Sequence, residues 1–148
     1  MENLKLRRSA RKDSERIENL VNELNFKLVP PADGFGDEEE TICKKILDKD
    51  GNIIAGCVAY IYPWGCLFVD DLWVDEKYRR QELGSHLLQT VEDIAINRGC
   101  YLSVLGTGDF QAKPFYLKHG YTLSGTVHDH PRGHEDYELF KRLDEKQP

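Results

Sequence analysis

Strand-forming runs separated by turn residues predict an antiparallel meander in the middle of the chain. The segments 41–47 and 52–62 are rich in β-branched and aromatic residues, and the sequence 48–52 between them supplies the Asp, Gly and Asn of a hairpin turn. After a second turn at Pro63-Trp64-Gly65, the apolar run 67–74 predicts a central, mostly buried strand.

Apolar residues three and four positions apart predict two longer helices. The first covers Ser14 to Phe26, and Asp13 or Ser14 can cap its start. Its apolar face consists of Ile17, Leu20, Val21 and Leu24. The second begins near Gln81 and ends before Gly99, where a left-handed residue is easily accommodated.

The remaining pattern completes a mixed sheet. A short strand at 101–105 follows the second long helix, so that strand, helix and parallel strand form the right-handed unit of α/β folds. A short helix is expected at 112–119, and a closing strand pair at 121–127 and 135–143. Residues 4–6 alternate only weakly and predict a first strand with little support of their own.

Two aspartates, Asp70 and Asp71, interrupt the central strand. Neighbouring strand residues point to opposite faces unless a bulge re-aims one of them, so at least one carboxylate should face a polar group. A structural explanation also stands: one aspartate caps a bulge or pairs with an arginine. The residues that follow predict an anion site, because Arg79 and Arg80 precede the free backbone amides and positive dipole end of a helix.

Two segments carry a family resemblance. The sequence from Tyr78 to Ser85 resembles the acetyl-CoA diphosphate loop of the GNAT superfamily of N-acetyltransferases. The sequence from Asp109 to Tyr116, followed by Gly120-Tyr121, resembles that family's second cofactor segment. The two segments occur in the family's order, and together they are far more specific than either alone.

The resemblance implies an α/β (α+β) fold of three layers. We expect a mixed central sheet of about six to seven strands flanked by about four helices, with two parallel central strands that splay apart. It implies one acetyltransferase domain over 1–148, with its core at about 4–143. The length also suits a single domain.

The same resemblance implies roles for individual residues. Tyr116 would be the general acid, Asp70 the base and Asp71 the anchor of the acceptor amine, as in the acidic strand pair of polyamine acetyltransferases. The implied acetyl-CoA contacts are Leu72, Trp73, Val74, Arg79, Arg80, Gln81, Glu82, Leu83, Gly84, Ser85, Asp109, Ala112 and Phe115. Glu82 replaces a family glycine and Asp109 a family asparagine, so both depart from the pattern.

The net charge restricts the class of partner, and the cysteine spacing and the lack of long apolar runs indicate the compartment. A net charge of −6 argues against general nucleic-acid or anionic-membrane binders and is compatible with a cationic amine. The four cysteines have no Cys-x-x-Cys spacing, and no apolar run approaches the length of a membrane span. We therefore expect a cytoplasmic protein with reduced thiols, and a homodimer is compatible with the family.

Three features leave alternatives open. The histidines at 128, 130 and 134 suggest a metal site, an acceptor-side lid or a solvated loop, and we expect no metal. The acidic run 38–40 is a solvated patch or a rim that attracts a cation. Tyr60, Tyr62 and Trp64 line an acceptor pocket or only cover the core.

The function expected from this sequence is acetyl transfer from acetyl-CoA to a primary amine of a small molecule, by direct attack. A catalytically silent CoA-binding domain and an acetyltransferase for protein lysines or N-termini are the alternatives.

Overall fold

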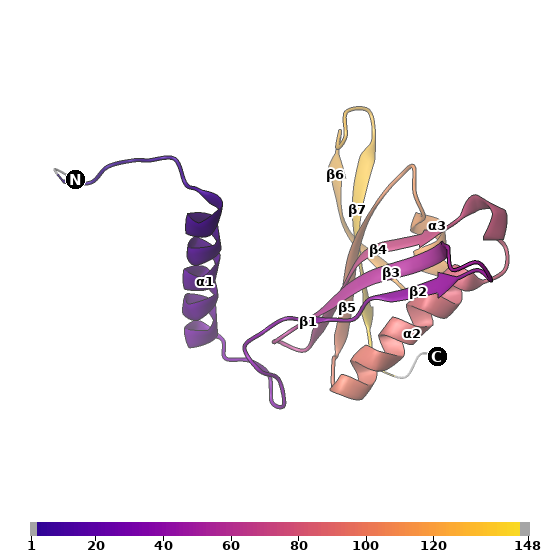
Figure 1. Cartoon of the computed structure of the whole chain (residues 1–148), viewed down its shortest axis with the longest axis horizontal. Coiled ribbons are helices and arrows are strands. Elements are labelled where there is room, and N and C mark those ends of the chain that lie inside the picture. The colour runs from indigo at the N-terminus through magenta and orange to yellow at the C-terminus, as the bar shows by residue number, and fades with distance from the viewer. Residues whose placement is uncertain (1–2, 146–148) are drawn as a thin grey trace.

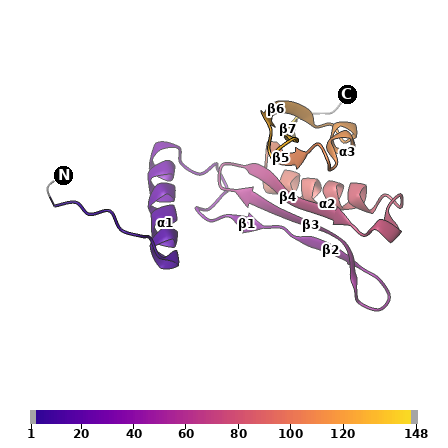
Figure 2. The same ribbon diagram turned by 90° about the horizontal axis from the view of Figure 1, so that it is seen from above.

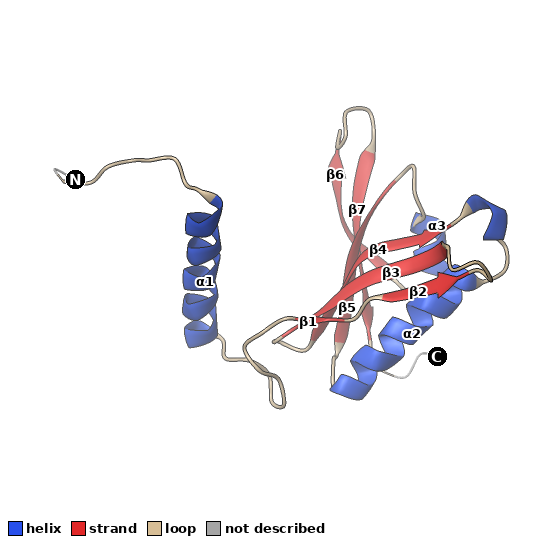
Figure 3. Ribbon diagram, viewed as in Figure 1, coloured by secondary structure: helices blue, strands red, loops and turns tan. Residues whose placement is uncertain are grey.

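One mixed sheet, with the helices beside it, positions the predicted site residues. The computed structural model describes residues 3–145 and shows a seven-stranded mixed sheet with three α-helices and one 3-10 turn (Figures 1 and 3). The helices are α1 (Arg11–Leu28), η1 (Glu76–Tyr78), α2 (Leu83–Arg98) and α3 (Lys113–Lys118). The strands are β1 (Glu40–Thr41), β2 (Lys44–Leu47), β3 (Ile53–Tyr62), β4 (Cys66–Val74), β5 (Leu102–Gly108), β6 (Thr122–His128) and β7 (Glu135–Arg142).

The strands lie in the order β1-β3-β4-β5-β7-β6, and β2 pairs with β3 on the same side as β1. Only β4 and β5 are parallel, and α2 connects them. The mixed sheet and its α/β connection are therefore as predicted. The expected strand at 41–47 is divided, because Ile42 leaves the ladder while its amide still donates to the carbonyl of Ala59 (2.8 Å).

The hydrophobic core lies between the sheet and α2. On β3 the alternate residues Ala55, Cys57, Ala59 and Ile61 are buried, as the period of two requires. They form one cluster with the buried face of α2, which consists of Leu87, Leu88, Val91 and Ala95. Figure 2 shows α2 lying along one side of β3 and β4.

A buried polar network ties α2 to the strands behind it. Glu92 of α2 is only 2% exposed, and its carboxylate accepts hydrogen bonds from the Tyr121 hydroxyl (2.9 Å) and the Lys141 ammonium (2.8 Å). The Tyr121 hydroxyl also lies 2.8 Å from the hydroxyl of Ser103 on β5. The carboxylate is thus compensated by a cation and a hydroxyl donor, which is the condition for burying it.

The two parallel strands splay apart, as the family resemblance implied. Pairing between β4 and β5 runs from Cys66 and Leu102 to Val69 and Leu105 and then stops. Beyond this point β4 pairs only with β3, while β5 continues beside β7 as far as Gly108. Backbone groups on the β5 side of the last β4 residues therefore have no ladder partner within the described chain.

Helix α1 is present and extends beyond the predicted bounds 14–26 at both ends. No α1 residue is buried, and the helix projects away from the sheet in both views (Figures 1 and 2). The prediction of a first strand at 4–6 is wrong: these residues lie in no strand, and Leu4 and Leu6 are 73% and 97% exposed. The segment lies away from the sheet edge, so no neighbouring backbone offers it a ladder.

The end of α1 is fixed to the turn between β3 and β4. The Trp64 indole N–H donates to the carbonyl of Val29 (2.9 Å), and the amide of Ala32 donates to the carbonyl of Pro63 (2.8 Å). The ring of Phe26, in the last turns of α1, packs edge-on against Trp64 at 5.8 Å. These contacts determine the direction in which α1 leaves the sheet.

Candidate active site

A loop followed by a helix start forms an anion cradle at one end of the sheet. Residues Leu83, Gly84 and Ser85 begin α2, and their amides precede the first intrahelical hydrogen bond, from His86 N–H to the carbonyl of Glu82 (3.0 Å). The positive end of the α2 dipole points the same way. A hollow of about 250 Å³ lies here, lined by Val74, Tyr78, Arg79, Arg80, Glu82, Leu83, Gly84, Ser85 and Phe115.

The backbone conformation of Glu82 explains why glycine suits this position. Glu82 is the N-cap of α2 with φ of 61°, in the left-handed region, and Arg80 has φ of 70°. The Glu82 side chain is exposed and makes no capping hydrogen bond. The departure from the family glycine thus introduces backbone strain and a negative charge at the rim of the hollow.

Most of the predicted cofactor residues meet at this hollow, and five do not line it. Gln81 lines a neighbouring hollow of about 570 Å³, and Leu72 and Ala112 pack on the core. Trp73 lines a third hollow on the sheet, and Asp109 lies in the loop before α3. Two residues were missed: Tyr78, which stands inside the recognised loop, and His119, which lies four positions after Phe115.

His119 links the end of α3 to the start of α2. Its Nε2 lies 2.9 Å from the hydroxyl of Ser85, and its ring packs against Phe115 at 4.5 Å. Burial lowers the pKa of His119, so the ring is neutral near pH 7. The Ser85 side chain is thus occupied by the protein, which leaves its backbone amide for an anion.

Tyr116 is a buried phenol packed against two other aromatic rings. Its ring packs between Phe115 (5.2 Å) and Tyr121 (5.7 Å), and it is only 7% exposed. Burial, followed by the nearby Cys57 and Asp71, raises the pKa of Tyr116 to about 12. Its hydroxyl is therefore protonated throughout the physiological range.

A bulge brings both strand carboxylates to the same region. The register shifts from Val58 opposite Asp71 to Ala59 opposite Val69, which leaves Asp70 as the extra residue. After desolvation, the charge of Asp70 is the main cause that raises the pKa of Tyr60. Asp71 contributes less to the raised pKa of Tyr60 and acts on Tyr116 as well. It lines a hollow of about 510 Å³ with Trp73, Gly56, Val58, Cys57, Ile53, Cys43, Lys44 and Lys45.

Comparison with known proteins decides the family, because the model of the acetyltransferase (GNAT) family matches residues 8–121. The chain belongs to the GNAT family. It is an acetyl-CoA-dependent N-acetyltransferase, and the cradle, the splayed strands and Tyr116 are features that suit this cosubstrate. The α2 amides with Arg79 and Arg80 would hold its diphosphate, and the strand gap would take its extended arm.

Individual relatives agree with this assignment. Over 94 residues the chain is 39% identical to blasticidin-S acetyltransferase of Streptomyces morookaense, covering 63% of this chain and 68% of that enzyme. It is 26% identical to thialysine N-ε-acetyltransferase of Mus musculus, covering 58% of this chain and 57% of that enzyme. The crystal structure of an acetyltransferase from Bacillus cereus superposes with a TM-score of 0.86 at 35% identity, covering 96% and 99% of the two chains.

Cys57 is not a suitable nucleophile for this acetyltransferase. Although it lines the hollow beside Asp71, its side chain is buried, and burial raises the pKa of the thiol to about 12. A thiol with that pKa is almost entirely protonated near pH 7, and the thiolate is the reactive form. The environment of Cys57 therefore does not support an acetyl-cysteine route.

Asp109 holds a hairpin together. Its two carboxylate oxygens accept from Nδ1 of His134 (2.8 Å) and from the amide of Glu135 (3.0 Å), and the backbone donor at Glu135 is the main cause of its lowered pKa. The connection from β6 to β7 is a closed turn in which the Gly133 amide donates to Asp129 (2.6 Å). Within residues 3–145 there is no group of His, Cys, Asp or Glu arranged to hold a metal ion.

The helices were also compared with the requirements of a membrane span. None of them, within residues 3–145, combines the length and apolarity that crossing a bilayer requires.

Proposed function

We propose that this acetyltransferase transfers the acetyl group of acetyl-CoA to a primary amine of a small cationic molecule bound over Asp70 and Asp71. The proposal is supported mainly by three features that lie next to one another on β4. The ladder to β5 ends after Val69, the bulge falls at Asp70, and the field of Asp71 reaches Tyr116.

The hollow beside Asp71 suits an ammonium group. Its walls combine one carboxylate with the exposed indole of Trp73, and aromatic faces and carboxylates both attract cations. Lys44 and Lys45 on the opposite wall disfavour a dense polycation there. The acceptor is therefore a small molecule with its reactive amine at one end.

The transfer proceeds in balanced steps. A proton leaves the ammonium group, through a carboxylate or through water, and the neutral amine attacks the thioester carbonyl. A C–N bond forms, the C–S bond breaks, and the hydroxyl of Tyr116 gives its proton to the departing sulfur. The nitrogen loses its second proton as the amide forms, and a proton delivered through water restores the Tyr116 phenol. No oxidant, metal or covalent enzyme adduct is needed for this balance.

The geometry favours an exchange of the roles that the sequence suggested for the aspartates. Asp71 lies on the side of Tyr116 and lines the hollow, so it is the better base candidate. After desolvation, Asp70 raises the pKa of Tyr60 more than Asp71 does, and it also acts on Tyr62, which suits an anchor for a second positive charge of the acceptor.

The test is release of free CoA from acetyl-CoA with a panel of amines, each paired with its hydroxyl analogue. Blasticidin S, thialysine and spermidine represent the compounds acetylated by named relatives and a polyamine. We expect at least one amine, and no hydroxyl analogue, to accelerate release at least tenfold over hydrolysis.

Calorimetry with acetyl-CoA, run in parallel, separates the alternatives. Binding of acetyl-CoA without acceleration by any amine would contradict the proposal in favour of a silent domain. Acceleration only by peptides would point to a protein acceptor.

A further inference from the structure

Helix α1 presents an apolar surface that nothing covers within the described chain. Its residues Ile17, Leu20, Val21 and Leu24 share one face and are between 45% and 55% exposed. An isolated helix of this length is marginal in water, and helices normally gain their stability by packing such a face. The surface therefore indicates a partner.

A second surface, over which the described chain places no helix, is formed by partly exposed side chains and lies on the sheet opposite α2. The registers align Tyr60, Phe68, Val104 and Phe140 in one row across β3, β4, β5 and β7. Their neighbours in the strands are the buried core residues, so the row faces away from α2, and all four side chains lie outside the core cluster. Among the described residues, Figure 2 shows no helix over this face of β3 and β4.

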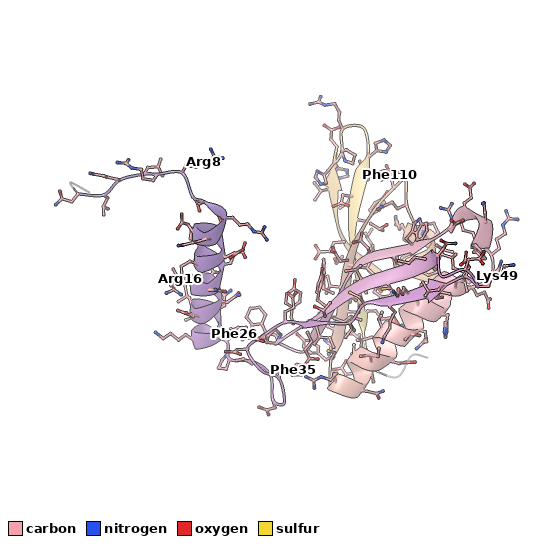
Figure 4. All side chains as sticks on the ribbon, in the orientation of Figure 1. Arg8, Arg16, Phe26, Phe35, Lys49 and Phe110 are labelled. Atoms are coloured by element: carbon pink, nitrogen blue, oxygen red, sulfur yellow. The ribbon has the colours of Figure 1, made fainter. Side chains whose placement is uncertain are left out.

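The helix cannot cover the sheet of its own chain without breaking contacts. Besides the tether at Trp64, the connecting segment is held at two further points. The guanidinium of Arg98 lies over the ring of Phe35 (5.0 Å) and pairs with the carboxylate of Glu40. Figure 4 shows Phe26 at the end of α1 where the connecting segment begins, Arg16 further along the helix and Arg8 in the segment before it.

The charges of the two surfaces are complementary. The segment before and at the start of α1 carries Lys5, Arg7, Arg8, Arg11 and Lys12. The carboxylate charges that act on Tyr60 in the open sheet face are those of Asp70, Glu39 and Asp71, with Lys44 and Lys45 further along beside Trp73. A basic segment of one copy therefore meets the carboxylates around Tyr60 of another, which favours a second copy of this chain over an unrelated apolar partner.

Helix α1 is long enough to cross the whole row. An α-helix of 18 residues is about 27 Å long, and four strands of a sheet span about 14 Å between the outer axes. Residues 3–28 are nearly a fifth of the chain, so the TM-score of 0.86 with the Bacillus cereus crystal structure requires that the projecting part superposes as well. The projection of α1 is thus shared with a crystallised relative.

We propose that residues 3–28 of a second copy lie across the row Tyr60, Phe68, Val104 and Phe140, and that the exchange is reciprocal. In this dimer each α1 forms a wall beside Asp70 and Asp71 of the other copy. That part rests on the proposed function, because it assumes that the acceptor binds there.

The first experiment measures mass in solution by light scattering and acetyl-CoA affinity by calorimetry. We expect the wild type at twice the mass of the 17.1 kDa chain, and Leu20→Lys at the mass of one chain at the same concentration. Asn19→Lys places the same charge on the opposite face and should stay dimeric.

Acetyl-CoA affinity should change less than twofold in both variants, because the cradle lies on α2 of the same copy. A monomeric wild type, or a Leu20→Lys variant that remains dimeric, would overturn the proposal. Loss of acetyl-CoA binding in the wild type would instead count against the proposed function.

The second experiment identifies which chain covers the sheet. In a Cys43→Ser background, Leu20→Cys on one tagged chain and Phe68→Cys on a chain with another tag should form a disulfide between the two tags on mixing. A chain that carries both cysteines and closes only within itself would show that α1 folds back, and no disulfide in either arrangement would show that the face stays uncovered. Both of these results contradict the proposal.

Discussion

At the residue scale, the left-handed conformation of Glu82 has a measurable cost. A non-glycine residue in this region costs about 1 kcal/mol or more relative to glycine. We expect Glu82→Gly to raise the free energy of unfolding by about 1 kcal/mol in urea titrations. Removing its charge from the rim should tighten acetyl-CoA binding several-fold in calorimetry.

Gln81→Gly is the matched control, because Gln81 is exposed, adjacent and not left-handed. It should give no gain in stability. Weaker acetyl-CoA binding in Glu82→Gly would show that the carboxylate assists the cradle.

The pKa of Tyr116 predicts the alkaline side of the rate profile. Because burial raises the pKa to about 12, the phenol keeps its proton, and the turnover number should show no falling limb below about pH 10.5. Tyr116→Phe should lower turnover about 100-fold with acetyl-CoA affinity nearly unchanged. A falling limb near pH 9 that disappears in Tyr116→Phe would contradict the assigned pKa.

The two aspartates can be separated by their kinetic signatures. Asp71→Asn should lower turnover most at low pH, where the acceptor amine needs a base, while Asp70→Asn should mainly raise the KM of the acceptor. The measurement is a pair of pH profiles with the best amine of the panel. The opposite pattern would restore the roles that the sequence alone suggested.

At the scale of elements, the contact between α2 and α3 makes stability depend on pH. The lowered pKa of His119 means that the unfolded chain binds more protons than the folded one near pH 6, so stability falls as pH decreases below about 6.5. His119→Gln should lose less stability between pH 7 and 5.5 than the wild type in urea titrations. The exposed His86→Gln should behave as the wild type.

The elements that the sequence predicted are those that local pattern determines. The strand alternation of 52–62, the turn at 48–52 and the helical period after Gln81 all have their causes within a few residues, and the structure contains them. The location of α1 has its cause in contacts from Val29 to Trp64, which are distant in sequence. Periodicity predicts which face of a helix is apolar, but it does not say which surface covers that face.

The same distinction applies to the candidate site. The cradle from Tyr78 to Ser85 is one continuous segment, so its residues could be recognised together. The partners of Asp109 lie 25 and 26 residues away, and no local pattern reveals that His134 and Glu135 engage its carboxylate. The bulge at Asp70 was foreseen only as a possibility, because it depends on register with β3.

At the scale of the whole molecule, a reciprocal dimer predicts that stability depends on protein concentration. Dissociation accompanies unfolding, so the melting temperature of the wild type should rise when its concentration is raised a hundredfold. Leu20→Lys should melt at one temperature across the same range. A concentration-independent wild type would contradict the dimer, whatever its acceptor.

The network around Glu92 also has a consequence for the reach of the bound cosubstrate. The helix that begins at the cradle is clamped at its middle to Tyr121, which closely follows the α3 phenol Tyr116. The network therefore fixes the distance between the cradle, which would hold the nucleotide, and the Tyr116 phenol, which would meet the sulfur. An enzyme with such a fixed span should discriminate among thioesters by the length of the arm and tolerate variation beyond the carbonyl.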